Sequence, residues 1–283
     1  MTENPYLTLP RIKAALRTLE LRPTRGMGQN FLIDRIALGQ IVDAADLQPT
    51  DTIVEVGPGL GVLTWELVQR AGQVISVELD KRLEARLHEE FAQCSNLRII
   101  QQDILNAPPE TLVDGPYKLV ANLPYAITSP VLRHFLTSER RPEIFVILVQ
   151  WEVAERIAAK VGDLSVLAHS IQVYAQPTII ARVGANSFYP APAVDSAILR
   201  LQVYPQPLDA NPEGLMRTIK AGFLHARKTL SNALPSGLAA MGRPTNREQA
   251  VAALQAAHVD PQRRAETLTL AEWQQVHAAL GPH

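Results

Sequence analysis

The feature that most constrains the fold is an alternation of short apolar segments with helical patterns. The first apolar segment, 52–56, runs into a glycine-rich turn at 57–61. Three more apolar segments follow at 74–79, 97–101 and 118–121, and helical patterns separate them. This alternation is typical of a parallel sheet that carries helices on both faces. The sequence therefore predicts a doubly wound α/β fold, in which ligands bind at the carboxyl ends of the strands.

Residues suited to a nucleoside follow the first three predicted strands. The glycine turn allows the backbone to approach a ligand closely, but its G-x-G-x-G spacing and Pro58 disfavour a pyrophosphate cradle. Glu78 follows the turn by about 20 residues, where an acid can bond both hydroxyls of a ribose. Asp103 follows the third strand and can accept a hydrogen bond from an adenine amino group. A strand-end surface charge is the alternative interpretation of Glu78.

The fourth predicted strand ends at Asn122-Leu123-Pro124-Tyr125. The asparagine offers an amide acceptor, and Pro124 biases Leu123 towards an extended conformation that can turn its carbonyl outward. Tyr125 offers a flat face on which a base can stack. These residues predict a site that holds an exocyclic amino group with two acceptors and the ring by its face. The alternative is a strand end with a proline turn and a surface tyrosine.

A second aromatic residue, Phe188, lies in the proline-stiffened loop 187–196. We predict that its ring lies beside the site, opposite Tyr125. The alternative is a core phenylalanine that lies under the loop.

Composition and a proline-rich linker predict two domains. Hydrophobic residues make up 47% and charged residues 19% of the 283 residues, which indicates a globular chain. The proline-rich link 204–212 separates the α/β pattern from a tail of helical patterns, so we predict domains at 1–204 and 205–283. Domain 1–204 begins with a basic helix at 9–20.

The formal net charge of −1 does not indicate a nucleic-acid-binding protein, but the basic residues are clustered. One cluster lies in the N-terminal segment and one in the helical tail, and each has a solvated helix face as its alternative. Their members are Arg11, Lys13, Arg17, Arg22 and Arg25, and Arg217, Lys220, Arg227, Lys228, Arg243 and Arg247.

Several classes of protein are disfavoured. The single cysteine, Cys94, excludes an internal disulfide framework and suits a reducing cytosol. The first residues lack the apolar region of a signal peptide, and no apolar run approaches the ~20 residues that span a bilayer. No cluster of cysteine and histidine has metal-ligand spacing. We expect a cytoplasmic protein without a metal.

In this order, the motifs resemble the ribosomal RNA adenine-N6 dimethyltransferases, the KsgA-like family of class I S-adenosylmethionine-dependent enzymes. The resemblance covers almost the whole chain. Asn-Leu-Pro-Tyr with Gln-Asn-Phe-Leu is specific to RNA adenine-N6 methylation, and Arg-Lys-Thr-Leu favours the small-subunit enzymes. The motifs are Leu21-Arg22-Pro23, Gly28-Gln29-Asn30-Phe31-Leu32, Glu55-Val56-Gly57-Pro58-Gly59-Leu60-Gly61, Glu78-Leu79-Asp80, Asp103, Asn122-Leu123-Pro124-Tyr125, Glu152-Val153-Ala154-Glu155-Arg156, Phe188-Tyr189-Pro190-Ala191-Pro192, Val194-Asp195-Ser196 and Arg227-Lys228-Thr229-Leu230.

The resemblance implies a Rossmann-like methyltransferase sheet flanked by helices, with a small all-helical C-terminal domain that binds RNA or the ribosome. It implies S-adenosyl-L-methionine as cofactor and a monomer acting on small-subunit ribosomal RNA or an immature small subunit. The implied product is N6,N6-dimethyladenosine at two adjacent adenines near the 3′ end. The implied cofactor residues are Gln29, Asn30, Leu32, Gly57, Gly59, Glu78, Leu79, Asp103, Ile104 and Asn122, and the implied catalytic residues are Asn122, Leu123, Pro124, Tyr125 and Phe188.

The chain departs from the family pattern outside the cofactor core. Trp151 stands where the family usually has lysine, the 161–163 loop is short, and Ala193, Ala226 and Ser231 replace basic residues. Several of these changes remove positive charge, so they bear on RNA docking.

Four other functions remain open from the sequence. A large-subunit resistance methylase would share the core, and a ribosome-assembly factor would use methylation only secondarily. DNA is chemically possible as substrate because its adenine amine is the same. The glycine spacing and the lack of a hydride-transfer constellation disfavour a nicotinamide dehydrogenase.

Overall fold

The computed structural model describes residues 4–21 and 30–281, so the predicted site residue Gln29 and the basic residues Arg22 and Arg25 lie outside the described residues. The chain divides into two compact units. The sheet unit comprises Met1–Ala154 and Thr178–Val203, and the helical unit comprises Glu155–Pro177 and Tyr204–His283. The predicted boundary at residue 204 assigns residues 155–177 to the first domain, whereas in the structure they cluster with the C-terminal helices.

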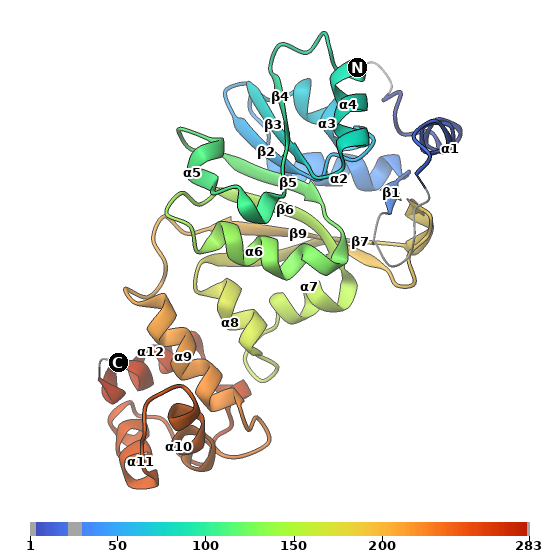
Figure 1. Cartoon of the computed structure of the whole chain (residues 1–283). Helices are drawn as coiled ribbons and strands as arrows, with labels where there is room; N and C mark the ends of the chain where they lie inside the picture. The colour runs from blue at the N-terminus through green and yellow to red at the C-terminus, as the bar shows by residue number, and fades with distance from the viewer. Residues whose placement is uncertain (1–3, 22–29, 282–283) are drawn as a thin grey trace. The chain divides into compact units, whose positions relative to one another are not determined.

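The sheet has seven strands in the order β4-β3-β2-β5-β6-β9-β7 (Figure 1). The strands are β2 (Thr52–Val56), β3 (Gln73–Glu78), β4 (Leu97–Gln101), β5 (Lys118–Asn122), β6 (Ile144–Gln150), β7 (Ala175–Val183) and β9 (Ser196–Val203). The five strands from β4 to β6 pair in parallel, as predicted, but β9 runs antiparallel to β6. The sheet is therefore mixed. The sequence does not show this, because β6 and β9 do not follow each other in the chain and an apolar run does not indicate strand direction.

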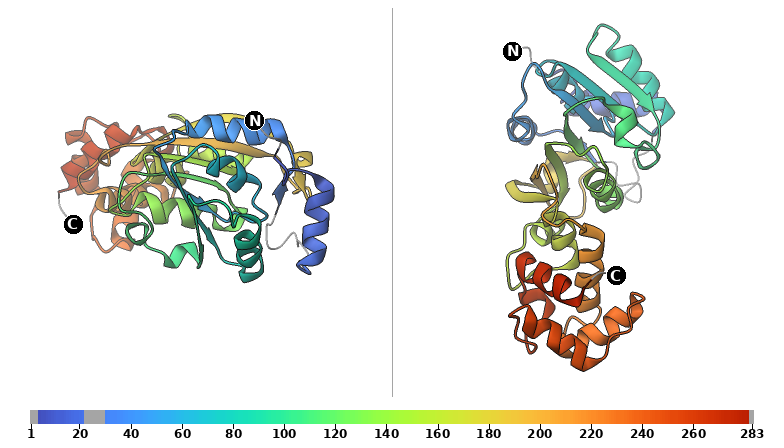
Figure 2. Two further views of the ribbon diagram at one scale, coloured as in Figure 1. Left: turned by 90° about the horizontal axis from the view of Figure 1, so that it is seen from above. Right: turned by 90° about the vertical axis from the view of Figure 1, so that its left-hand side faces the viewer.

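Helices cover both faces of the sheet, with α2 on one side and α6 on the other (Figures 1 and 2). The helices of this unit are α1 (Leu9–Thr18), α2 (Arg35–Ala45), α3 (Val62–Val68), α4 (Lys81–Glu90), α5 (Pro109–Leu112), α6 (Thr128–Leu136) and the start of α7 (Trp151–Ile157). Two of these helices begin at aspartate side-chain caps. Asp34 accepts hydrogen bonds from the N–H groups of Ile36 and Ala37, and Asp80 accepts one from Arg82.

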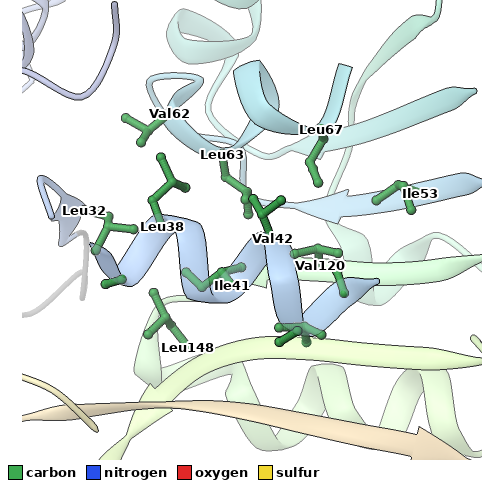
Figure 3. Close-up of a cluster of buried hydrophobic side chains, with 14 of the residues drawn as sticks. Leu32, Leu38, Ile41, Val42, Ile53, Val62, Leu63, Leu67, Val120 and Leu148 are labelled. Atoms are coloured by element: carbon green, nitrogen blue, oxygen red, sulfur yellow. The ribbon is translucent and has the colours of Figure 1, made fainter. Parts of the chain in front are cut away.

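The main core lies between the sheet and the helices α2, α3 and α4. Leu38, Ile41 and Val42 project from α2 towards Leu63 of α3 and Val120 of β5 (Figure 3). Apolar residues at this spacing form one face of the helix, so burying them fixes the position of α2 behind the sheet. The segment before α2 is thereby held against the edge where the strands end.

The N-terminal segment is tied to this unit by polar and aromatic contacts. The Asn4 Nδ2 atom donates to the Val62 carbonyl at 2.9 Å, and Tyr6 stacks on Phe91 with ring centroids 5.2 Å apart. Arg11 and Tyr6 both donate to the Glu90 carboxylate. Further along, the short strand β1 (Phe31–Leu32) pairs antiparallel with β8 (Phe188–Tyr189). These contacts join residues 4–11 and 31–32 to the rest of the sheet unit.

The helical unit comprises α8 (Val166–Gln172), α9 (Pro212–Phe223), α10 (Leu230–Ala240), α11 (Arg247–Ala256) and α12 (Leu270–Leu280). The last four, orange to red in Figure 2, pack around Leu215, Leu234 and the fully buried Trp273. Pro235 lies inside α10, which continues past it to Ala240. Packing of its buried face therefore outweighs the helix-breaking tendency of proline. Among the described residues, none of the helices has the length and apolar character needed to cross a bilayer.

Close helix packing in this unit leads to a stability prediction. A Cβ atom at Gly237 of α10 would overlap the Ala221 carbonyl of α9. We expect Gly237→Ala to lower the free energy of unfolding by about 2–3 kcal/mol, because the backbones must separate. Urea denaturation followed by circular dichroism measures this change.

The matched control is Gly39→Ala, since Gly39 lies on the exposed side of α2 and a Cβ there meets nothing within 4 Å. Alanine in that helix is expected to stabilise the protein by up to about 1 kcal/mol. Equal midpoints for the two variants would contradict the packing that we describe.

Candidate cofactor and base-binding site

A cavity lies at the carboxyl edge of the sheet. Its walls come from the ends of β2, β3 and β5 and from the segment that enters β1, and a second pocket adjoins it beyond Glu78. The predicted residues in the first cavity are Asn30, Leu32, Gly57, Gly59, Glu78, Asn122, Leu123, Pro124 and Tyr125. Those in the adjoining pocket are Gly57, Glu78, Leu79, Asp103, Ile104 and Pro124. Every predicted site residue that the structure describes, Phe188 excepted, therefore lines one of two pockets that share part of their walls.

The glycine turn between β2 and α3 has a backbone that favours glycine. Gly57, Gly59 and Gly61 have φ angles of 66°, 59° and 83°. At Gly61 a Cβ atom would also lie 2.6 Å from the ring of Phe91. The turn brings the Gly59 N–H to 3.1 Å from Glu78 Oε2, so the turn and the acid form one connected wall of the cavity.

Glu78 ends β3 and is buried. Its Oε1 atom accepts a hydrogen bond from the Asp80 N–H at 2.9 Å. Burial raises the pKa of Glu78, and the backbone N–H groups oppose that rise by stabilising the carboxylate. A carboxylate has about four acceptor positions. Glu78 can therefore accept two ribose hydroxyls while it keeps both backbone contacts.

The adjoining pocket suits a planar aromatic ring. Leu79 exposes 64% of its surface beside the buried Ile104, which is unusual for an apolar side chain. Asp103 uses Oδ1 to accept from the Leu105 N–H at 3.0 Å. An adenine can lie between the two apolar side chains with its amino group near the acid.

Glu55 also lines the cavity, although it is not among the predicted site residues. It lies within β2, is 1% exposed, and accepts hydrogen bonds through Oε2 from the Thr64 and Ser76 hydroxyls at 2.8 and 2.6 Å. Among the described residues, its Oε1 atom has no hydrogen-bond partner. Burial raises the pKa of Glu55 to about 7, against the effect of the two hydroxyls. The sequence signal that indicates this residue is an acid inside an otherwise apolar strand.

Glu78 and Glu55 fit the cofactor that the motifs imply. S-adenosylmethionine carries a ribose, an adenine and a cationic amino-acid end. Glu78 suits the ribose, the pocket at Leu79 suits the adenine, and the unpartnered oxygen of Glu55 suits a cation. A buried carboxylate oxygen without a hydrogen bond is costly, and a cationic ligand beside Glu55 Oε1 would reduce that cost.

Asn122 and Tyr125 form the other side of the cavity. The Asn122 Nδ2 atom donates to the Asn30 carbonyl at 3.2 Å, which leaves Oδ1 as the acceptor. Tyr125 begins a short 3-10 turn, and its hydroxyl lies 2.7 Å from Ser196 Oγ. Ser196 starts β9 and is buried, so it anchors the ring from the far side. The sequence alone does not indicate this contact of Ser196.

Phe188 departs from the prediction. Its side chain is 3% exposed and belongs to the core cluster of the sheet unit, next to Leu32 in the β1–β8 pair. It does not line either pocket. In this structure Phe188 is therefore a core phenylalanine, the alternative interpretation of its position. Successive side chains of a strand point to opposite faces, and the Phe188 side chain points towards the core.

Known proteins resemble the chain along nearly its whole length. The family model described as "Ribosomal RNA adenine dimethylase" matches residues 22–276. A protein of Dehalococcoides mccartyi named "Ribosomal RNA small subunit methyltransferase A" is 46% identical over 279 residues, covering 96% of this chain and 93% of its own. A protein of the same name from Alkaliphilus metalliredigens is 39% identical and covers 93% of each chain.

Solved structures agree with the fold. The 23S rRNA methyltransferase ErmE is 29% identical, with a TM-score of 0.69 over 89% of this chain and all of its own. A dimethyladenosine transferase from Plasmodium falciparum has a TM-score of 0.75 over 87% of this chain and 95% of its own, at 24% identity. The Rossmann-like methyltransferase fold with a helical C-terminal region is thereby confirmed. The chain therefore belongs to the ribosomal RNA adenine dimethylase family of S-adenosylmethionine-dependent methyltransferases.

Proposed function

We propose that this chain methylates N6 of two adjacent adenines near the 3′ end of small-subunit ribosomal RNA. The product is N6,N6-dimethyladenosine, made while the small subunit matures. Relatives named for the small subunit, at 39–46% identity, support this substrate. The observation that carries the proposal is the Asn122 acceptor and the adjoining Leu123 carbonyl at a cavity that also contains Glu55 and Glu78.

The chemistry requires alignment more than activation. The adenine amino nitrogen is a weak nucleophile, because its lone pair is delocalised into the ring, whereas the cofactor supplies an already activated sulfonium methyl group. Asn122 Oδ1 and the Leu123 carbonyl accept the two N–H bonds and favour a more tetrahedral nitrogen. Its lone pair then points towards the methyl group. Alignment of this kind can contribute up to ~7–11 kcal/mol when the geometry is ideal.

The target base must leave its stack to reach these acceptors. Unstacking costs a few kcal/mol, and stacking on Tyr125 offsets part of it. The Ser196 contact holds the Tyr125 ring in place before the base arrives. A stacking role for Phe188 requires its ring to leave the core, which the closed packing around it opposes.

Dimethylation requires the same site to act twice on each base. After the first transfer the amino group has one N–H, so only one of the two acceptors is used and the other position must hold a methyl group. We propose that spent cofactor exchanges between the transfers. Asn122 and Leu123 are therefore needed in both rounds.

The proposed partner is the immature small ribosomal subunit, which a monomer binds in the cytoplasm. The helical unit carries exposed basic side chains that can contact phosphates, namely Arg217, Lys220, Arg227, Lys228 and Arg247. Arg243 of the same cluster is partly buried and donates to the Gly281 carbonyl at 2.8 Å, so it is committed to the fold.

The test is transfer of labelled methyl from S-adenosylmethionine to under-methylated small subunits, with large subunits and DNA in parallel. Dimethyladenosine on the small subunit alone supports the proposal. Label on the large subunit would identify a resistance-type methylase instead. Cofactor binding without label anywhere would point to an assembly factor.

The raised pKa of Glu55 leads to a pH prediction for cofactor binding. A cationic ligand stabilises the ionised carboxylate, so affinity is full where Glu55 is already ionised and falls as pH drops below about 7. We expect the Kd of S-adenosylmethionine, measured without RNA, to rise about five- to tenfold from pH 7.5 to pH 6, as a smaller fraction of Glu55 is ionised. Calorimetry at each pH measures it.

The control for this prediction is Glu55→Gln, which keeps the shape but cannot ionise. Its Kd is expected to stay flat over the same pH range. If the two proteins show the same pH slope, the cation site that we place at Glu55 is wrong.

A further inference from the structure

Trp151 is joined to the target-base site by a short path of contacts. It follows β6 directly and begins α7, and its backbone N–H donates to the Asp195 carbonyl at 2.9 Å. The next residue, Ser196, pairs in register with Gln150 and contacts the Tyr125 hydroxyl. The indole therefore lies beside the element that anchors Tyr125.

A cation is stacked on this indole. The Arg182 guanidinium carbon lies 4.7 Å from the centre of the Trp151 ring. Arg182 also bonds Asp195 Oδ2 through both Nε and a terminal nitrogen, each at 2.9 Å. The other oxygen of Asp195 accepts from the Ala185 N–H at 3.1 Å. The Arg182 guanidinium is thus held in place over the Trp151 ring.

The stack remains accessible. The Arg182 side chain is 58% exposed although it is paired with an acid, and Trp151 is only half-buried. A guanidinium on an indole presents a flat, cationic surface to solvent. Single-stranded bases stack on such aromatic and guanidinium planes.

We infer that Trp151 and Arg182 form a stacking platform for the nucleotide that flanks the pair of target adenines. This inference rests on the proposed function, because it concerns the same RNA strand. When the target base is extruded, its neighbour loses a stacking partner within the RNA. The platform replaces that partner and holds the strand while Tyr125 holds the target. Lysine in place of Trp151 would supply charge but no aromatic face.

The experiment compares wild type with Trp151→Ala and Trp151→Phe on under-methylated small subunits. Two substrates are used, with a purine or a pyrimidine at the nucleotide that flanks the pair of target adenines. The Kd of each subunit and the KM and kcat of transfer are measured. Trp65→Phe is the matched control, since Trp65 packs against Tyr6 in the N-terminal segment.

We expect Trp151→Ala to raise the Kd and KM of the purine substrate about tenfold, in the range of base stacking on an aromatic side chain. The pyrimidine substrate, which stacks more weakly, is expected to change about two- to threefold, so the purine preference shrinks. Trp151→Phe keeps an aromatic face and most of the preference. The values of kcat, cofactor affinity and the Trp65→Phe control are expected to match wild type.

Unchanged purine preference in Trp151→Ala would overturn the platform, as would an equal loss in Trp151→Phe. A fall in kcat or cofactor affinity without a change in subunit Kd would also overturn it, and would assign the stack to support of the fold. Failure of the proposed function appears differently. The wild-type protein would then transfer no methyl to small subunits, while the Kd comparison would still decide the role of Trp151.

Discussion

Replacing Asn122 with alanine is expected to lower kcat by roughly 10²–10³-fold, the loss typical of removing one preorganised polar group from an active site. Its Oδ1 is the side-chain acceptor at the mouth of the cavity, and the hydrogen bond to the Asn30 carbonyl fixes its orientation. Without it the target amino group keeps only the Leu123 carbonyl. Cofactor affinity should change little, since Glu55, Glu78 and the glycine turn remain.

Single-turnover transfer to under-methylated small subunits, with calorimetry of S-adenosylhomocysteine binding, separates these two effects. Asn122→Asp keeps an acceptor oxygen but places a charge near the Asn30 carbonyl, so an intermediate rate is expected. Asn232→Ala, at an exposed position of α10, is the matched control. A near wild-type rate for Asn122→Ala would show that the amide does not hold the base.

Local rules made much of this site predictable. Asp34 and Asp80 each precede a helical pattern, the position where aspartate caps a helix, and both do so. Asn122 and Glu78 were placed at strand ends by counting apolar runs, and the parallel register of β2, β3 and β5 then brings those ends to one edge. Prediction succeeds where the position of a residue follows from its own strand and from the geometry of parallel sheets.

Long-range packing accounts for what was missed. Ser196 contacts Tyr125 only because β9 pairs with β6, and no local pattern records that pairing or its antiparallel direction. Phe188 was predicted at the site, but pairing of β8 with β1 turns its ring into the core. Likewise α10 passes Pro235 because packing against α9 stabilises the helix. Each of these features depends on partners distant in sequence.

Replacing Glu78 with alanine is expected to raise the Kd of S-adenosylhomocysteine roughly 10²-fold or more, since a carboxylate–hydroxyl bond contributes about 1.5–3 kcal/mol and two are lost. The variant also loses the contact that orients the Gly59 N–H. Glu78→Gln keeps one acceptor oxygen, so an increase of about tenfold is expected. Glu89→Ala, on the exposed side of α4, is the matched control.

Glu78→Ala should lower cofactor affinity but leave kcat at saturating cofactor nearly unchanged, whereas Asn122→Ala should lower kcat and leave cofactor affinity nearly unchanged. At saturating cofactor the rate of Glu78→Ala is expected to return to within a few-fold of wild type, because the acceptors for the target amino group are intact. Asn122→Ala should show the reverse, a low rate with normal cofactor affinity. If Glu78→Ala stays slow at saturation, Glu78 also positions the methyl group for transfer. Unchanged affinity would instead show that Glu78 does not bind the ribose and only supports the Gly59 turn.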